Sequence, residues 1–280
     1  MVLKFIRAYF KITSIVAPKS AGRTGFKLFQ KVRIKKIRDR ENDFYDRAEK
    51  FTVPYDKEDI DCYELGSPKG KLVVLVHGWE SNAGSMSQLA FKFSDLGYRV
   101  VAFNLPGHAF YSSSSTNLLE CFTAMKKVLN YLNPQEPFSI VSHSLGSAVV
   151  ANTLSRTNYE IDRLVFLSSP NKVNEIFMEF KEIVAMNDKA YKEMVKVTDR
   201  LLNASIDTLD VDTNLKKAKY NELLIIHDKN DRILSYNNSK TIEQLTPNSR
   251  LITLENVGHY KMLWDSDVIN RTVSFIEKQQ

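Results

Sequence analysis

The feature that most constrains the fold is a series of short, uninterrupted apolar runs that alternate with longer segments of helical periodicity. Uninterrupted runs are typical of strands buried on both faces of a sheet, because neither face accepts polar side chains. Strands that alternate with helices are joined by right-handed crossovers and build a mostly parallel sheet with helices on both faces. We therefore predict an α/β fold with a doubly wound sheet. The six runs occupy residues 71–78, 98–107, 138–144, 163–169, 221–228 and 249–257.

Further elements complete the predicted sheet and its helical layers. Two strands joined by a turn precede the first buried run, at 50–55 and 59–66. Apolar residues at helical spacing predict helices over about 85–96, 117–132, 145–155 and 264–278. A chain of 280 residues with 43% apolar content is large enough to bury one full core. We assign residues 49–280 to this α/β domain.

The first 48 residues form a basic amphipathic extension of different composition. They hold thirteen Lys and Arg residues and four acidic residues, whereas the whole chain has a net charge of only +6. The apolar residues Phe5, Ile6, Tyr9, Phe10 and Ile15 interleave with Lys4, Arg7 and Lys11, a spacing compatible with one apolar helical face. The extension either docks on the body, stays solvated or makes peripheral contact with an anionic membrane surface.

Several classes of site and location are not indicated by the sequence. Lys4, Arg7 and Lys11 break every apolar stretch of the extension before it reaches the roughly 20 residues of a membrane-spanning helix. Cys62 and Cys121 have no partner spacing for a zinc site or a disulfide framework, so we expect a cytoplasmic protein without a metal. Nothing calls for an organic cofactor, and no nucleic-acid motif appears beyond generic positive charge.

Ser144 lies where a buried strand is followed at once by a helix, in the sequence "SHSLG". Such a bend holds its central residue in a strained backbone geometry, which requires small neighbours two positions away on either side. Ser142 and Gly146 are small. The bend directs the Ser144 hydroxyl away from the sheet, toward the positive end of the following helix dipole. Because chemistry in such sheets gathers at the carboxyl ends of the strands, Ser144 is the candidate nucleophile.

A serine nucleophile needs a base that takes its proton and a carboxylate that orients the base. His259 follows the last buried run, and Asp231 follows the fifth, with Asp228 as its rival in the same loop. The order serine, acid, histidine is the one expected for a nucleophile at a strand-to-helix bend. The backbone N–H of Leu145 and that of a residue after the run 71–78, for which we choose Trp79, are candidates for the oxyanion hole. His77 is interpreted as a structural brace, and the Trp79 ring either lines a pocket or packs.

The chain from about residue 49 to 280 resembles the α/β hydrolase family. The similarity is carried by "VHGW" for the oxyanion loop, "NLPGHAFYS" for a turn typical of the family, "SHSLG" for the nucleophile bend, "HDKNDRI" for the acid loop and "GHY" for the histidine loop. The acid-loop motif favours Asp231 over Asp228. Three positions depart from the family pattern: Asn104 replaces Asp, Ala109 replaces Gly and Ser142 replaces Gly. None of the three removes a catalytic group.

The segment at about 171–219 separates the fourth and fifth buried runs. Its apolar residues recur at helical spacing, which predicts two or three helices. The resemblance implies a lid at this place, which would cover Ser144 and select the acyl group. Phe177, Phe180 and Met186 are its candidate pocket residues, with packing inside the segment as the other interpretation.

The sequence therefore predicts a serine hydrolase that acts on a small carboxylic ester or thioester through an acyl-enzyme on Ser144. A cofactorless haloperoxidase or a carbon–carbon bond hydrolase would use the same three residues. The alternatives from other classes are a non-catalytic binding or scaffold protein that retains the fold, and a membrane-surface lipase or lysolipase that depends on residues 1–48.

Overall fold

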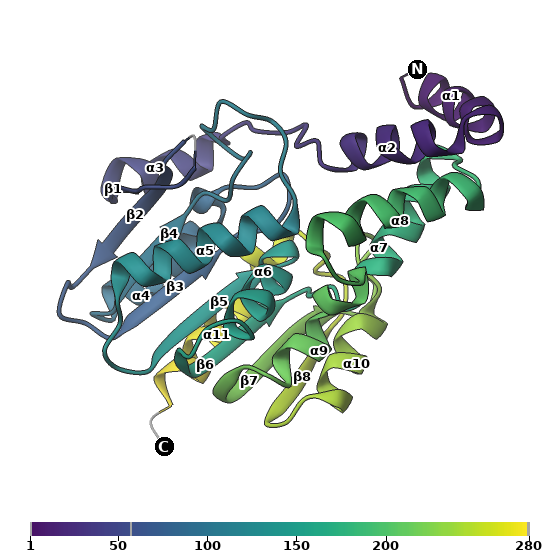
Figure 1. Cartoon of the computed structure of the whole chain (residues 1–280). Coiled ribbons are helices and arrows are strands. Elements are labelled where there is room, and N and C mark those ends of the chain that lie inside the picture. Colours follow the sequence, from purple (N-terminus) through teal and green to yellow (C-terminus); the bar gives the residue numbers. More distant parts are fainter. Residues whose placement is uncertain (1, 57, 279–280) are drawn as a thin grey trace. The chain divides into compact units, whose positions relative to one another are not determined.

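An eight-stranded mixed sheet forms the centre of the larger part of the molecule (Figure 1). The computed structural model describes residues 2–56 and 58–278, so residue 57 and the outermost residues of both predicted ranges lie outside it. The strand order is β1-β2-β4-β3-β5-β6-β7-β8. Strands β1 and β2 run antiparallel, β2 is antiparallel to β4, and the other neighbours pair in parallel. The strands are β1 (Glu49–Val53), β2 (Ile60–Gly66), β3 (Leu72–Val76), β4 (Arg99–Phe103), β5 (Phe138–His143), β6 (Glu160–Leu167), β7 (Lys219–Asp228) and β8 (Ser249–Leu254).

Helices pack on both faces of this sheet. Alternate strand residues such as Leu75, Val141 and Ile226 share one core with α4 (Ser87–Asp95) and α11 (Ser266–Glu277). Their sequence neighbours point to the opposite face, because side chains alternate along a strand. That face is covered by four further helices, among them α6, which contacts both β3 and β5. These are α5 (Leu118–Leu132), α6 (Leu145–Leu154), α9 (Val211–Leu215) and α10 (Tyr236–Leu245).

The structure contains each of the eight predicted strands, with ends that differ by a few residues. Of the predicted helices, the one at 85–96 begins with the 3₁₀ turn η1 (Ala83–Met86) before α4. Helix α10 was not predicted from the sequence. Only Ser239 and Ile242 of this helix are buried, so its sequence, YNNSKTIEQL, carries almost no apolar periodicity.

The chain divides into two compact units, and the elements described for the smaller one are helices. It combines the first 31 residues with residues 172–210, whereas residues 32–171 and 211–280 form the larger unit around the sheet. Residues 32–48, including α3 (Asp39–Arg47), thus belong with the sheet. The smaller unit contains α1 (Val2–Val16), α2 (Pro18–Phe29), α7 (Val173–Val184), α8 (Asp188–Leu202) and the 3₁₀ turn η2 (Ile206–Leu209).

Two glycines of α2 allow the helices of the smaller unit to approach closely. A Cβ atom on Gly22 would lie only 2.7 Å from the carbonyl oxygen of Ala190 in α8, and one on Gly25 would overlap the methyl group of Met186. Phe10 of α1 is buried beside the same helix. The segment from 172 to 210 is therefore packed against the N-terminal helices rather than forming an independent insertion.

Candidate functional site

Ser144 sits on a strained bend between β5 and α6. Its φ of 53° and ψ of −125° lie in a region that residues other than glycine rarely adopt. The bend requires a close approach on its helical side, because a Cβ on Gly146 would lie 2.4 Å from the carbonyl oxygen of Val76. The Ser144 N–H donates to the carbonyl of Leu167 at 2.9 Å. These contacts hold the hydroxyl at the start of α6, as the sequence predicted.

Ser142 replaces the usual glycine of this motif without opening the bend. Its hydroxyl lies 3.0 Å from that of Ser147 and donates to the carbonyl of Val165. Ser142 and Ser147 flank Ser144 in the chain, so one hydrogen bond joins the strand side of the bend to the helix side.

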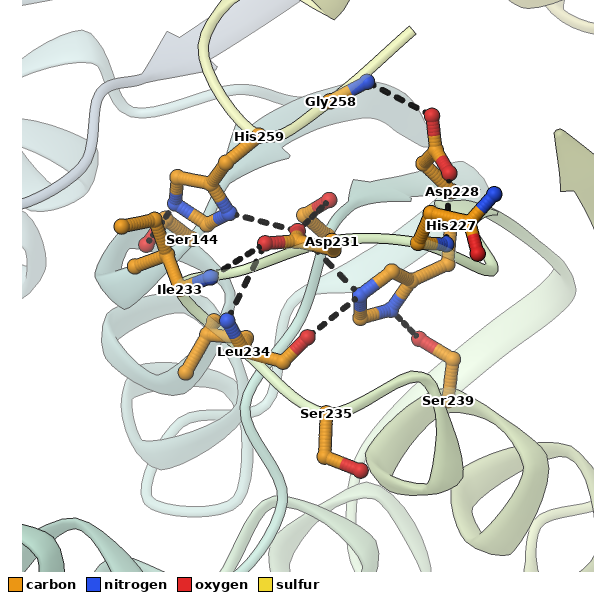
Figure 2. A network of polar contacts seen from close by, with 12 residues as sticks. Ser144, His227, Asp228, Asp231, Ile233, Leu234, Ser235, Ser239, Gly258 and His259 are labelled. Atoms are coloured by element: carbon orange, nitrogen blue, oxygen red, sulfur yellow. Dashed lines mark hydrogen bonds and ion pairs between the residues drawn. The ribbon is translucent and has the colours of Figure 1, made fainter. Parts of the chain in front are cut away.

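The structure brings Ser144, His259 and Asp231 together in one hydrogen-bonded chain (Figure 2). His259 Nε2 lies 3.0 Å from the Ser144 hydroxyl, and His259 Nδ1 lies 2.7 Å from Asp231 Oδ2. The carboxylate can only accept, so Nδ1 carries the hydrogen and Nε2 is left to accept the proton of Ser144. All three side chains are nearly or fully buried. This geometry is the one that a nucleophile, a base and an orienting acid require, and these three roles stay a prediction.

Asp231 accepts hydrogen bonds on both of its oxygens. The hydroxyl of Ser168 donates to Oδ2 at 2.9 Å, while the backbone N–H groups of Ile233 and Leu234 donate to Oδ1 at 2.7 and 3.1 Å. Burial by itself would raise the pKa of Asp231, but the hydrogen bonds from His227 and His259 and from the Ile233 backbone outweigh it and hold the pKa well below its ordinary value. Asp231 is therefore ionised at every pH at which the protein would be assayed.

A second histidine also contacts this carboxylate. His227 Nε2 lies 3.3 Å from Asp231 Oδ2 and 3.2 Å from the carbonyl oxygen of Leu234, while its Nδ1 lies 2.6 Å from the Ser239 hydroxyl (Figure 2). The carbonyl can only accept, so Nε2 carries the hydrogen and Ser239 donates to Nδ1. The polar chain thus extends from Ser239 through His227 to Asp231. His227 and Ser168 lie in the predicted buried runs 221–228 and 163–169, but the sequence did not indicate their contacts with Asp231.

Asp228, the rival acid, has a different set of partners. Its Oδ2 accepts from the backbone N–H of Gly258 at 2.6 Å and from that of Val257, and its Oδ1 accepts from Asn230 at 2.7 Å. Burial opposes its ionisation, but these backbone N–H groups lower its pKa overall. Asp228 thus fixes the loop that carries His259, whereas Asp231 contacts the imidazole itself.

His143 braces His259 from the residue before the nucleophile. Its Nε2 lies 2.9 Å from the carbonyl oxygen of His259, and the centroids of the His143 and His259 rings are 4.8 Å apart. Burial, reinforced by the neighbouring His259, lowers the pKa of His143 to about 3. A neutral His143 donates to that carbonyl and adds no charge beside the base.

The loop after β3 lies directly against the nucleophile. A Cβ on Gly78 would be 2.9 Å from the Cβ of Ser144. His77 fixes this loop, because its Nδ1 donates to the Gly78 carbonyl and its Nε2 accepts from the Leu105 N–H. Trp79 packs its ring edge-on against His108. Leu145 is the first residue of α6, where a backbone N–H has no acceptor within its own helix. The oxyanion role of Trp79 and Leu145 stays a prediction.

The three candidate pocket residues are buried inside the smaller unit. Phe177 and Phe180 lie 4.4 and 5.3 Å, between ring centroids, from Phe29 of α2, and Met186 packs at Gly25. These contacts fit the packing interpretation. A role for Phe177, Phe180 and Met186 in a substrate pocket stays a prediction, as does a lid at 171–219.

Two departures from the family pattern preserve the local geometry. Ala109, where glycine is usual, keeps a positive φ of 47°, so the turn is retained at the cost of backbone strain. Asn104, where aspartate is usual, accepts a hydrogen bond from the Ala83 N–H at 2.9 Å. The loop between β4 and α5 therefore needs neither of the usual residues.

Comparison with known proteins agrees with this architecture. Residues 71–206 match the family model described as the alpha/beta hydrolase fold. Together with the mixed, mostly parallel sheet, this match confirms the predicted fold class: the protein has the α/β hydrolase fold. A curated relative, a serine hydrolase-like protein of Danio rerio, is 24% identical over 150 residues, which are 51% of this chain and 45% of that protein. This chain thus spans less than half the length of the relative.

Two solved structures share the fold at low sequence identity. A candidate lipase from Acinetobacter baumannii AYE has a TM-score of 0.65 and 17% identity, over 84% of this chain and 92% of that chain. A membrane phospholipase A, described as a bacterial virulence factor, has a TM-score of 0.63 and 15% identity, over 99% of this chain and 96% of that chain.

Proposed function

We propose that this protein is a serine hydrolase that cleaves a carboxylic ester or thioester through an acyl-enzyme on Ser144. The observation that carries the proposal is the continuous hydrogen-bonded chain from the Ser144 hydroxyl through His259 to Asp231. The candidate nucleophile also sits on the strained bend that presents a hydroxyl for attack. The likeness to a serine hydrolase-like relative supports the same class of reaction.

The proposed reaction begins when Ser144 attacks the carbonyl carbon of the substrate. His259 Nε2 takes the hydroxyl proton, and the ionised Asp231 stabilises the imidazolium that forms. The backbone N–H groups of Leu145 and Trp79 would donate to the developing oxyanion, aided by the positive end of the α6 dipole. The tetrahedral intermediate then collapses, and His259 returns the proton to the departing alcohol or thiol.

Deacylation repeats these steps with water as the nucleophile. His259 takes a proton from water, which attacks the acyl carbon, and the acid product leaves as Ser144 regains its proton. Because burial keeps His143 neutral, no second positive charge opposes the imidazolium of His259 in either half of the reaction.

The direct test is labelling by a fluorophosphonate, which reacts with activated serines, followed by hydrolysis of p-nitrophenyl esters of increasing chain length. We expect label on Ser144, and a decrease of at least about 10⁴-fold in kcat for Ser144→Ala. Matched oxygen esters and thioesters of one acyl group would distinguish the two leaving groups. An unlabelled, folded protein without esterase activity would favour the scaffold interpretation.

A second candidate function is hydrolysis of lipids at a membrane surface. It is favoured by the likeness to a membrane phospholipase A, which extends over 99% of this chain and so includes the N-terminal helices. A preference for long acyl chains presented in vesicles, rather than short soluble esters, would support this narrower function.

Both thiols, Cys62 and Cys121, are free and buried, as in proteins of a reducing compartment, and a cytoplasmic location stays a prediction.

A further inference from the structure

Helix α1 is apolar on two sides, and only one of them is covered. Phe10 and Ser14 are buried within the smaller unit. The outer side exposes a continuous set of large apolar residues at helical spacing, with Phe5 69% and Ile12 63% exposed. Isolated exposed apolar side chains need no explanation, but a contiguous set marks an interaction surface. The outer face comprises Val2, Phe5, Tyr9, Ile12, Ile15 and Val16.

The inner side of α1 is held in place by specific polar contacts. The Arg7 guanidinium donates to the carbonyls of Glu182 and Ile183, at 3.2 and 2.8 Å, in the last turn of α7. The side-chain amide of Asn187 donates to the carbonyl of Ser14 at 3.0 Å. Carbonyls at a helix C-terminus lack intrahelical partners and attract cations, so Arg7 fits this place. These contacts prevent α1 from turning its outer face inward.

The charged side chains of the two N-terminal helices have a single sign. The first 38 residues contain eleven Lys and Arg residues and no acidic residue. Lys4 and Lys11 are exposed and lie seven residues apart, on a row of the helix next to Ile15. On α2, Lys19, Arg23 and Lys27 are exposed as well. An apolar strip bordered by lysines matches the interface of a bilayer with anionic headgroups.

We propose that the outer face of α1 binds an anionic lipid surface, lying in the plane of the interface. The helix has 15 residues and is about 22 Å long, which is short of the bilayer core. No helix among the described residues is long and apolar enough to span a membrane. A second copy of the chain is a poorer partner, because pairing two such faces would bring like charges together without an acidic residue in either helix to offset them.

The test is co-sedimentation of the full chain with vesicles of phosphatidylcholine, alone or with 30 mol% phosphatidylglycerol (about one lipid in three, enough for a strongly negative surface). We expect binding only to the anionic vesicles. Phe5→Asp/Ile12→Asp should reduce binding by roughly tenfold or more, because the two apolar side chains that would enter the lipid interface are lost. Lys4→Gln/Lys11→Gln should weaken it by roughly fivefold per lysine. Leu201→Asp, at an exposed position of α8, is the matched control and should bind like the wild type.

Three results would overturn the proposal. They are equal binding by wild type and Phe5→Asp/Ile12→Asp, no preference for anionic vesicles, and a wild-type dimer in light scattering that the same substitutions dissociate. Both substituted residues are exposed, so circular dichroism should report an unchanged fold. The experiment measures lipid binding and not hydrolysis. An absence of lipid binding would therefore not contradict the proposed function of Ser144, and an absence of esterase activity would not contradict lipid binding by α1.

Discussion

Two aspartates three residues apart, at the end of β7 and in the turn that follows, serve the same histidine in different ways. Asp228 accepts from backbone N–H groups of the loop that carries His259, whereas Asp231 accepts from the imidazole of His259 and from that of His227. Both side chains are buried, and both carboxylates have lowered pKa values. A buried, ionised carboxylate is therefore not by itself a sign of catalysis, and the kind of donor that it meets decides its role.

Replacing Asp231 should give the largest difference between the two residues. In Asp231→Asn the side chain is neutral and no longer stabilises the imidazolium of His259, so kcat should fall by roughly 10³- to 10⁴-fold. Ester hydrolysis measured from pH 6 to 9 checks this. If the fall were only a few-fold in a folded protein, Asp231 would not be the orienting acid.

Lowering the pH should destabilise the fold through three histidines whose pKa burial lowers. Burial lowers the pKa of His77 well below its ordinary value, that of His108 to about 4 and that of His143 to about 3. In the unfolded chain these groups take up protons below about pH 6.5, so the unfolded state gains stability as the pH falls. His108 and His143 each contribute a loss on the order of 1.4 kcal/mol per pH unit in the free energy of unfolding, between about pH 6 and 4, and His77 acts in the same direction.

Urea unfolding at pH 7.5, 6.5 and 5 measures this slope. The lowered pKa of Asp231 keeps it ionised throughout this window, so its own contribution is lost only in stronger acid. The variant His143→Gln removes one of the three titrating groups and should make the slope shallower. A free energy of unfolding that stays constant or rises toward pH 5 would contradict the expectation.

Asp228→Asn should change stability more than chemistry. An asparagine has one acceptor oxygen in place of two, so at least one backbone N–H of the His259 loop or the turn loses its partner. The expected cost is about 1–3 kcal/mol in the free energy of unfolding, with kcat lowered by less than about tenfold. Thermal unfolding and ester hydrolysis on the same samples check both parts. Loss of all activity without loss of stability would mean that Asp228, and not Asp231, is the orienting acid.

The smallest effect is expected at the far end of the chain of polar contacts. Ser239→Ala removes the donor to His227 Nδ1 and should lower kcat by about fivefold or less, the worth of one hydrogen bond. Ser235→Ala is the matched control, because Ser235 caps the same helix through the Asn237 N–H but does not bond to His227. An equal decrease in kcat for both variants would mean that α10 acts only through its stability.

The strands and the strained bend were predictable because each depends on residues close together in the chain. An apolar run marks a strand, and "SHSLG" after such a run marks the bend at Ser144. The chain order of Ser144, Asp231 and His259 then suggested which loops would converge. The contacts of Ser168 and His227 with Asp231 were not predictable, since they depend on how β6 and β7 pair in the sheet.

The local sequence patterns also did not predict that the N-terminal helices pack with residues 172–210. Nothing in the composition of residues 1–31 indicates that they pack with 172–210 rather than with residues 32–48. That association depends on the absence of side chains at Gly22 and Gly25, which admits α8 and Met186 to the surface of α2. Helix α10 was missed for a related reason, because a largely polar sequence is helical only through its packing on β7 and β8.

The bond between the hydroxyls of Ser142 and Ser147 has a consequence for how this protein tolerates change at the bend. This hydrogen bond joins the strand and the helix on either side of Ser144, so it contributes to the rigidity of the turn, which a glycine at 142 could not do. A return to glycine at 142, which would restore the commoner motif, should therefore loosen this turn rather than improve it.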